Sequence, residues 1–307
     1  MSAATAIHSR LPAIPLVARA RTAWIILRIS IEERLVYRGE FMLGTLMRFV
    51  PVITYVFFWA AVFSAAGGNS TGAPAAQHGG SSRIAGYSYD ELIAYCLLTM
   101  VARAFSSMPT LASGIARSIR DGTIKKFLIQ PVDMLGFLLI GRVAHKLVYY
   151  LIATLPFAFV FYLCRGYFTH GWPPVPELAA GVASLVMSFL LGYFLEAAIG
   201  LIGFWFLEVT SLLFIYMLLS FFLCGQMFPL DMLDTMKLTG SITAFDLARC
   251  TPLQYLAYFP ATIFLGKIHG WQLIWGLAGE LAWLLALIAV CRLAWRRGVR
   301  RYSAFGG

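Results

Sequence analysis

The strongest constraint on the fold of this 307-residue chain is a set of six long hydrophobic runs. A helix rises ~1.5 Å per residue, so about 20 apolar residues cross the ~30 Å hydrocarbon core of a bilayer. Hydrophobic residues make up 60% of the chain and charged residues only 12%, whereas soluble domains are about one quarter charged. We therefore predict an all-α, polytopic membrane protein with six transmembrane helices, at about 42–65, 90–112, 136–164, 178–206, 209–228 and 271–294.

The distribution of positive charge predicts how the spans are oriented. The net charge is +10, and most lysines and arginines fall before residue 49, between 103 and 146, or after 291. These segments alternate along the chain, as the positive-inside rule requires of cytoplasmic segments. This pattern indicates a protein in contact with the lipid bilayer and not with nucleic acid, and it places both termini in the cytoplasm.

The parts outside the spans divide the chain into three regions. Residues 1–41 are predicted to form a cytoplasmic tail and an interfacial helix over Arg19–Glu40, although a soluble helix packed on a neighbour is the alternative. Residues 42–294 form the transmembrane domain, and 295–307 form a second cytoplasmic tail. Gly225–Gly270 is too polar to span but rich in apolar residues, so we predict short re-entrant helices at the outer face before the last span.

Arginine and glutamate also occur deep inside three of the predicted spans, where charge is expensive. Arg103 falls in the second run, Glu196 in the fourth and Glu280 in the sixth. The simpler interpretation is that Arg103 pairs with one of the two glutamates and fixes the register of the helices. The alternative is an ion-coupled secondary transporter that uses all three groups.

No catalytic or metal-binding pattern is present in the sequence. The five cysteines occur singly, and no HExxH, GxSxG or GxxxxGK[ST] motif occurs. We therefore predict no catalytic residues, no metal site and no enzyme activity for this chain, which leaves a membrane enzyme or assembly scaffold as a weaker third hypothesis. If ATP drives the protein, the nucleotide binds to a separate polypeptide.

One charged, non-spanning segment, Gly114–Asp133, lies between the second and third runs. Gly122 is typical of a helix end, Gln130 should be extended because it precedes Pro131, and Asp133 can cap the next helix. The segment combines basic side chains with apolar ones: Arg117, Arg120, Lys125 and Lys126 with a single internal acid, Asp121, and Ile115, Ile119, Leu128 and Ile129. It is either an ordinary positive-inside loop or a docking element for a soluble partner.

The chain resembles the six-span permease subunits of type-2 ATP-binding-cassette (ABC) exporters. The interfacial helix and six spans match that architecture, and the residues Ile119–Ile124 and Leu128–Asp133 are similar to the family's coupling segment. A third likeness is Cys224–Leu230 followed by Thr251–Tyr255, which is similar to the outer re-entrant region and includes Gly225, Phe228, Pro229 and Pro252.

The resemblance implies a bacterial plasma (inner) membrane protein that forms a substrate path with a second permease subunit, identical or related. Two cytosolic ABC ATPase subunits would bind ATP, and this chain would bind no cofactor. The coupling residues would be Arg117, Arg120, Asp121, Gly122, Lys125, Lys126, Gln130, Pro131 and Asp133.

Overall fold

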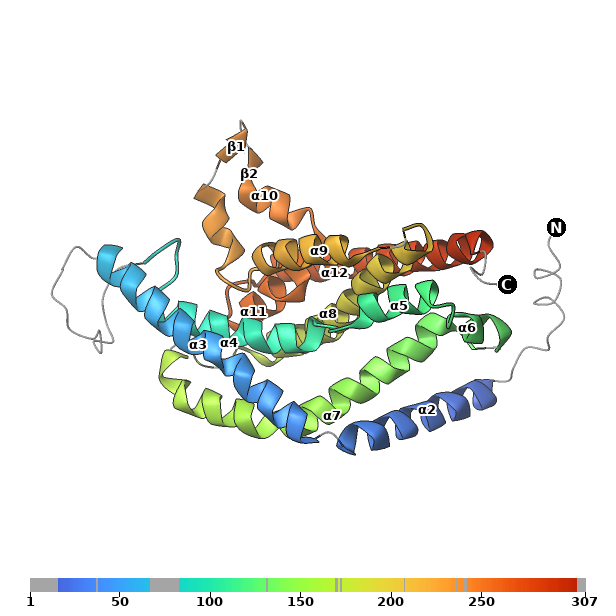
Figure 1. Ribbon diagram of the computed structural model, residues 1–307. Helices are drawn as coiled ribbons and strands as arrows, with labels where there is room; N and C mark the ends of the chain where they lie inside the picture. The colour runs from blue at the N-terminus through green and yellow to red at the C-terminus, as the bar shows by residue number, and fades with distance from the viewer. Residues whose placement is uncertain are drawn as a thin grey trace.

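The computed structural model describes residues 16–36, 38–66, 83–130, 132–168, 171, 173–206, 208–235, 237–239 and 242–302. These residues form a helical bundle (Figure 1), as predicted. The only strands in the described part of the chain are β1 (Lys237–Thr239) and β2 (Ile242–Thr243), which pair in an antiparallel hairpin that the sequence did not indicate.

The helices of the described part of the chain are numbered in chain order. Their bounds are α2 Leu16–Val36, α3 Arg38–Ala66, α4 Tyr89–Ser106, α5 Leu111–Arg120, α6 Lys125–Ile129, α7 Met134–Leu163, α8 Val175–Leu201, α9 Thr210–Leu223, α10 Ala244–Arg249, α11 Tyr258–Phe264 and α12 Gly270–Arg301. Short 3₁₀ turns are η1 Arg165–Tyr167, η2 Ile202–Phe204, η3 Leu230–Thr235 and η4 Pro252–Leu256.

Four helical stretches are long and apolar enough to cross a membrane. They are Tyr89–Arg120, Met134–Leu163, Val175–Phe204 and Gly270–Arg301, and they coincide with the second, third, fourth and sixth predicted runs. The first and fifth runs coincide with shorter apolar helices, Phe49–Ala65 and Thr210–Leu223. Four of the six predicted spans therefore have the length and composition of a membrane span, and the other two stay predictions.

Helix α8 lies at the centre of the bundle, in contact with α4, α5, α11 and α12. Glycines make these close contacts possible. A Cβ at Gly192 would stand 2.1 Å from the carbonyl oxygen of Ser106, and one at Gly200 would stand 2.8 Å from that of Ala112. Because backbone lies directly opposite, neither position has room for a side chain, and small residues of this kind let membrane helices approach closely.

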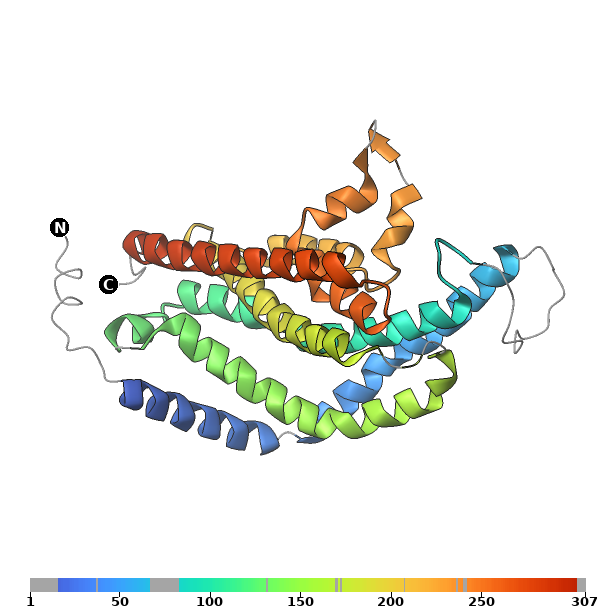
Figure 2. The same ribbon diagram turned by 180° about the vertical axis from the view of Figure 1, so that it is seen from behind.

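The first described helix, α2, packs along α7 (Figures 1 and 2). The contact agrees with the alternative of a helix packed on a neighbour. Its predicted position in the membrane interface stays a prediction.

The region between α9 and α12 is partly a projection and partly core. The turn η3, the β-hairpin and α10 project from the bundle, at the top of Figure 1. In contrast, η4 and α11 are packed into the largest apolar cluster, where Leu256, Ala257 and Ile263 are fully buried.

The predicted re-entrant residues lie in different surroundings. Gly225 is buried with φ +73°, and its carbonyl accepts a hydrogen bond from the Tyr95 hydroxyl at 2.5 Å. Of the other predicted re-entrant residues, Phe228 is half-buried, Pro229 is buried and Pro252 begins η4.

Candidate functional site

The segment 114–133 has the local geometry that its sequence predicts. Helix α5 ends at Arg120, the next residue caps it, and Gly122 has φ +75°. Gln130 is extended, with φ −82° and ψ 143°. The Asp133 side chain accepts a hydrogen bond from the Gly136 backbone N–H at 2.8 Å and so caps α7. These three local predictions are confirmed, whereas Pro131 lies outside the described residues.

The apolar side chains of this segment divide into an anchoring set and an exposed set. Ile115, Ile119 and Ile124 are buried against the ends of α8 and α12, in a cluster that includes Leu201 and Cys291. Leu128 is half-exposed and Ile129 is 83% exposed. The apolar surface expected from Ile115 and Ile119 is therefore used inside the protein, because one face of α5 lies directly on α8. Only α6 offers apolar side chains to a partner.

The basic side chains of the same segment are exposed as well. Arg117, Arg120, Lys125 and Lys126 are all exposed. Arg120 makes only a 3.7 Å ion pair with its neighbour Asp121, which is itself exposed. Exposed pairs of this kind contribute little, so most of the positive charge is available for an acidic partner.

The last turns of α12 support the segment from one side. The Arg292 guanidinium donates to the Asp133 carboxylate at 2.5 Å, and both side chains are about half exposed. The Tyr302 hydroxyl lies close to Gly122, and the Tyr302 ring contacts Phe204 edge-on. The segment therefore rests on α12 and on the buried cluster, and its charged side chains are exposed.

The predicted pairing of Arg103 with Glu196 or Glu280 stays a prediction, since Arg103 lies near enough to Glu196 for their charges to interact. In the described part of the chain Arg103 forms no ion pair, and its guanidinium donates to the Ser106 hydroxyl at 3.3 Å. Glu280 is fully buried and accepts a hydrogen bond from the Ser184 hydroxyl at 2.8 Å. Glu196 accepts a hydrogen bond from the Met108 backbone N–H at 3.3 Å. The Glu196 contact lies at a break in the second span, where a backbone N–H lacks its helical partner.

Three polar residues have structural roles that sequence analysis missed. Lys146 is only 7% exposed and donates to the carbonyl oxygens of Ala104 and Ser107. Arg142 donates to the carbonyl oxygen of Pro109. Asp231 accepts hydrogen bonds from the hydroxyls of Tyr87, at 2.7 Å, and Tyr258. The proline near the end of the second run is the signal from which the helix break could have been inferred.

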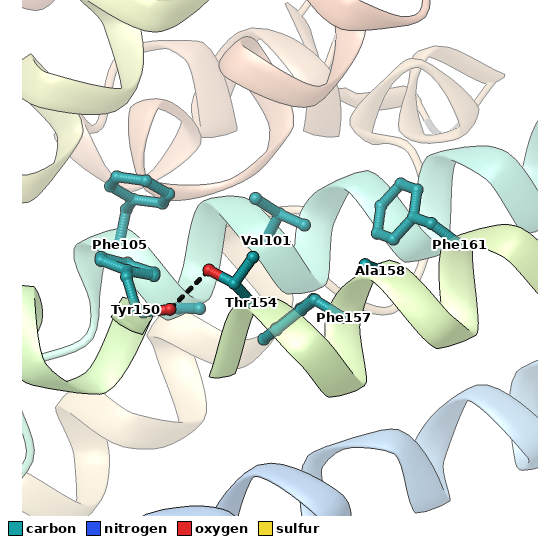
Figure 3. A pocket seen from close by; sticks show the side chains of 8 residues that line it. Val101, Phe105, Tyr150, Thr154, Phe157, Ala158 and Phe161 are labelled. Atoms are coloured by element: carbon teal, nitrogen blue, oxygen red, sulfur yellow. Dashed lines mark hydrogen bonds between the residues drawn. The ribbon is translucent and has the colours of Figure 1, made fainter. Parts of the chain in front are cut away.

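A cavity of about 320 Å³ lies between α4 and α7 (Figure 3). Its lining is almost entirely apolar, with Phe105, Phe157 and Phe161 prominent. The Thr154 hydroxyl at its wall donates to the Tyr150 carbonyl of its own helix at 2.6 Å. No charged side chain lines the cavity, so it lacks the polar groups that would orient a specific ligand.

The four long apolar stretches and their connections define a multi-pass helical membrane protein. A family model described as "ABC-2 family transporter protein" matches residues 75–306, so the chain belongs to the ABC-2 transporter family. It is therefore a membrane permease component of an ABC transporter, and not a catalytic domain. The match gives no support to an ion-coupled secondary transporter. A search of curated proteins found no match.

Proposed function

We propose that this chain is the six-span permease subunit of an ABC exporter and that residues 114–133 couple it to separate cytosolic ATPase subunits. The observation that carries the proposal is that this one segment exposes four basic residues together with Leu128 and Ile129, while its isoleucines Ile115, Ile119 and Ile124 are buried. An ATPase groove with an acidic rim and an apolar floor is complementary to this segment, because apolar contact supplies affinity and charge supplies orientation.

The remaining parts of the proposal follow from the family and from the charge pattern. The shorter apolar helices in α3 and α9 would complete the six spans, with both termini in the cytoplasm and the protein in the bacterial plasma membrane. A second permease subunit, identical or related, would complete the path for an amphipathic or lipid-like substrate. ATP would be bound by the ATPase subunits, and this chain would hold no cofactor.

Charge reversal in the segment tests the coupling. Arg120→Glu places a negative charge at an exposed position of the segment, while the buried anchors Ile115, Ile119 and Ile124 are unchanged. We expect the affinity for the cognate ABC ATPase to fall at least tenfold, about 1.4 kcal/mol. The measurement is co-purification of the ATPase with the tagged chain, followed by an ATPase assay. The purified chain alone should hydrolyse no ATP.

A matched control is Arg249→Glu, because Arg249 is an equally exposed arginine in α10, away from the segment. It should leave association at the parent level. Pro131→Ala tests a different link, since it keeps the charge and loosens the joint to α7. It should leave association intact and lower the ATP turnover of the complex. Parent-like behaviour of both Arg120→Glu and Pro131→Ala would reduce the segment to a positive-inside spacer.

A further inference from the structure

The second span is broken between its two halves. Helix α4 ends at Ser106, α5 begins at Leu111, and Thr110 between them has φ +65°, a left-handed conformation that is uncommon outside glycine. A helix break leaves the last carbonyls of one half and the first amides of the other without helical partners. Inside a membrane these groups must be satisfied by the protein, because water is not at hand.

The carbonyl groups at the break are bound by two cations of α7. Lys146 Nζ donates to the carbonyl oxygens of Ala104, at 2.5 Å, and Ser107, at 2.7 Å. The Arg142 guanidinium donates to the carbonyl oxygen of Pro109 at 3.0 Å. The two side chains are four residues apart, on the same face of α7. Positive charge at the carbonyl end of a helix is also favoured by the helix dipole.

The amide end is bound by α8. Glu196 Oε1 accepts a hydrogen bond from the Met108 N–H at 3.3 Å, just before α5 begins. One turn earlier, Gly192 lets the Ser106 carbonyl approach α8 so closely that no Cβ would fit. The Ser106 hydroxyl donates to the Leu256 carbonyl oxygen at 2.8 Å, which ties the break to η4 as well. The break is therefore held from two sides, by groups whose charges match the two helix ends.

We propose that Lys146 and Glu196 are positioning residues that fix the angle between α4 and α5, so that a movement of the coupling segment is transmitted into α4. This inference rests on the proposed function, because it takes α5 and α6 as the part that the ATPase moves. A broken helix can bend at its break. With Lys146 bound to carbonyls of the break and Glu196 bound to an amide there, α5 cannot tilt without displacing α4, α7 and α8.

Lys267 offers a control for Lys146, because it is a second lysine that binds groups near α4. Lys267 Nζ donates to the Glu91 carboxylate at 2.6 Å and to the Gly86 carbonyl oxygen at 3.1 Å, near the start of α4 and away from the break. Lys267→Met therefore removes a cation with similar bonds and controls for a general loss of stability.

The experiment follows backbone amide hydrogen exchange in the complex with the cognate ATPase, with and without trapping by Mg-ATP and vanadate. In the parent complex we expect trapping to change exchange in both 111–129 and 89–106. In Lys146→Met the change in 111–129 should keep its size, whereas the change in 89–106 should fall at least twofold. Glu196→Ala should act in the same way from the other helix, and it carries the test if Lys146→Met does not assemble. Lys146→Arg should restore the response. Lys267→Met should leave the response unchanged in 95–106, the part of α4 beyond the turn that Lys267 contacts.

The outcomes separate the two proposals. Trapping could change exchange in 111–129 while the change in 89–106 is equal in all variants or absent in the parent. Lys146 and Glu196 would then not transmit the movement into α4, and the coupling role of 114–133 would stand. An equal loss of the exchange change in Lys267→Met also contradicts the positioning role of Lys146 and Glu196, because it shows a general effect of lost stability. If trapping does not change hydrogen exchange in 111–129 of the parent complex, the proposed coupling role is wrong. The positioning role of Lys146 and Glu196 is then wrong as well.

Discussion

Two connections between long helices are built in opposite ways. The segment 114–133 buries three isoleucines and exposes its charges, whereas the region between α9 and α12 buries its η4 and α11 part. Ile129 in the first is 83% exposed, while Leu230, Leu256 and Ile263 in the second are fully buried. The contrast shows that the first connection exposes its charged side chains, whereas the second contributes η4 and α11 to the core.

Their polar groups differ in the same way. In the region after α9, Asp231 accepts hydrogen bonds from two tyrosines, and Gly225 binds Tyr95. Within the described part of the segment 114–133, Arg120 has only a neighbouring acid as an ion-pair partner, at 3.7 Å. Polar groups satisfied inside the protein stabilise the fold, whereas exposed charges with weak internal partners suit an external one.

The largest expected effect distinguishes two isoleucines of the same segment. Ile124→Ala removes a fully buried side chain from the cluster beneath the segment and should destabilise the protein by about 2–5 kcal/mol. Ile129→Ala removes a mostly exposed side chain and should change stability by less than about 0.5 kcal/mol. Chemical unfolding in detergent measures both. Similar losses in the two variants would contradict the division into anchor and surface.

An intermediate effect is expected at Asp231, in η3. Asp231→Ala leaves the hydroxyls of Tyr87 and Tyr258 without their common acceptor, and an unsatisfied buried group costs about 1–3 kcal/mol. Tyr87→Phe removes only one of the two bonds and should cost about 1 kcal/mol. The same unfolding assay ranks the variants. If Asp231→Ala were neutral, this region would not be held by its polar contacts.

The smallest effect is a pH dependence of the cap of α10. Hydrogen bonds from the Thr243 backbone N–H, at 3.1 Å, and from its hydroxyl, at 3.0 Å, hold the pKa of Asp246 below its ordinary 3.8. Because the pKa of Asp246 is lower in the folded state, its ionised carboxylate stabilises the fold at pH values above its ordinary pKa. This contribution is lost as the pH falls through the lowered pKa. Hydrogen exchange of α10 should therefore speed up, beyond the intrinsic change, only at acid pH. Asp246→Asn should abolish this dependence, and a pH response that persists in the variant would assign it to another group.

The sequence predicted those parts of the site that depend on local chemistry. Gly122 ends a helix and Asp133 begins one because each effect acts within four residues. The partner of Arg103 was not predictable in this way, since it depends on which helix faces lie opposite each other. The break after Ser106 was missed because the apolar run continues through it, and only Pro109 interrupts the helical pattern.

The same limit applies to Lys146 and to the spans. A lysine near the start of an apolar run is typical of the headgroup region, and only the packing of α7 on α4 shows that it is buried. Four spans were recognised from length and composition alone. Those rules cannot distinguish a span from a shorter apolar helix when the ends of a run are uncertain.

Helix α9 has a consequence for the membrane itself. It has 14 residues, so it is about 21 Å long, whereas the hydrocarbon core is about 30 Å thick. Among its side chains only Ser220 is buried, so its surface is free to face lipid. If α9 crosses the bilayer, the lipids beside it must thin to meet its apolar length, at a cost of a fraction of a kcal/mol for each ångström of mismatch. A bilayer of shorter acyl chains would then relieve this mismatch. The length of the lipid chains would therefore affect the protein at α9.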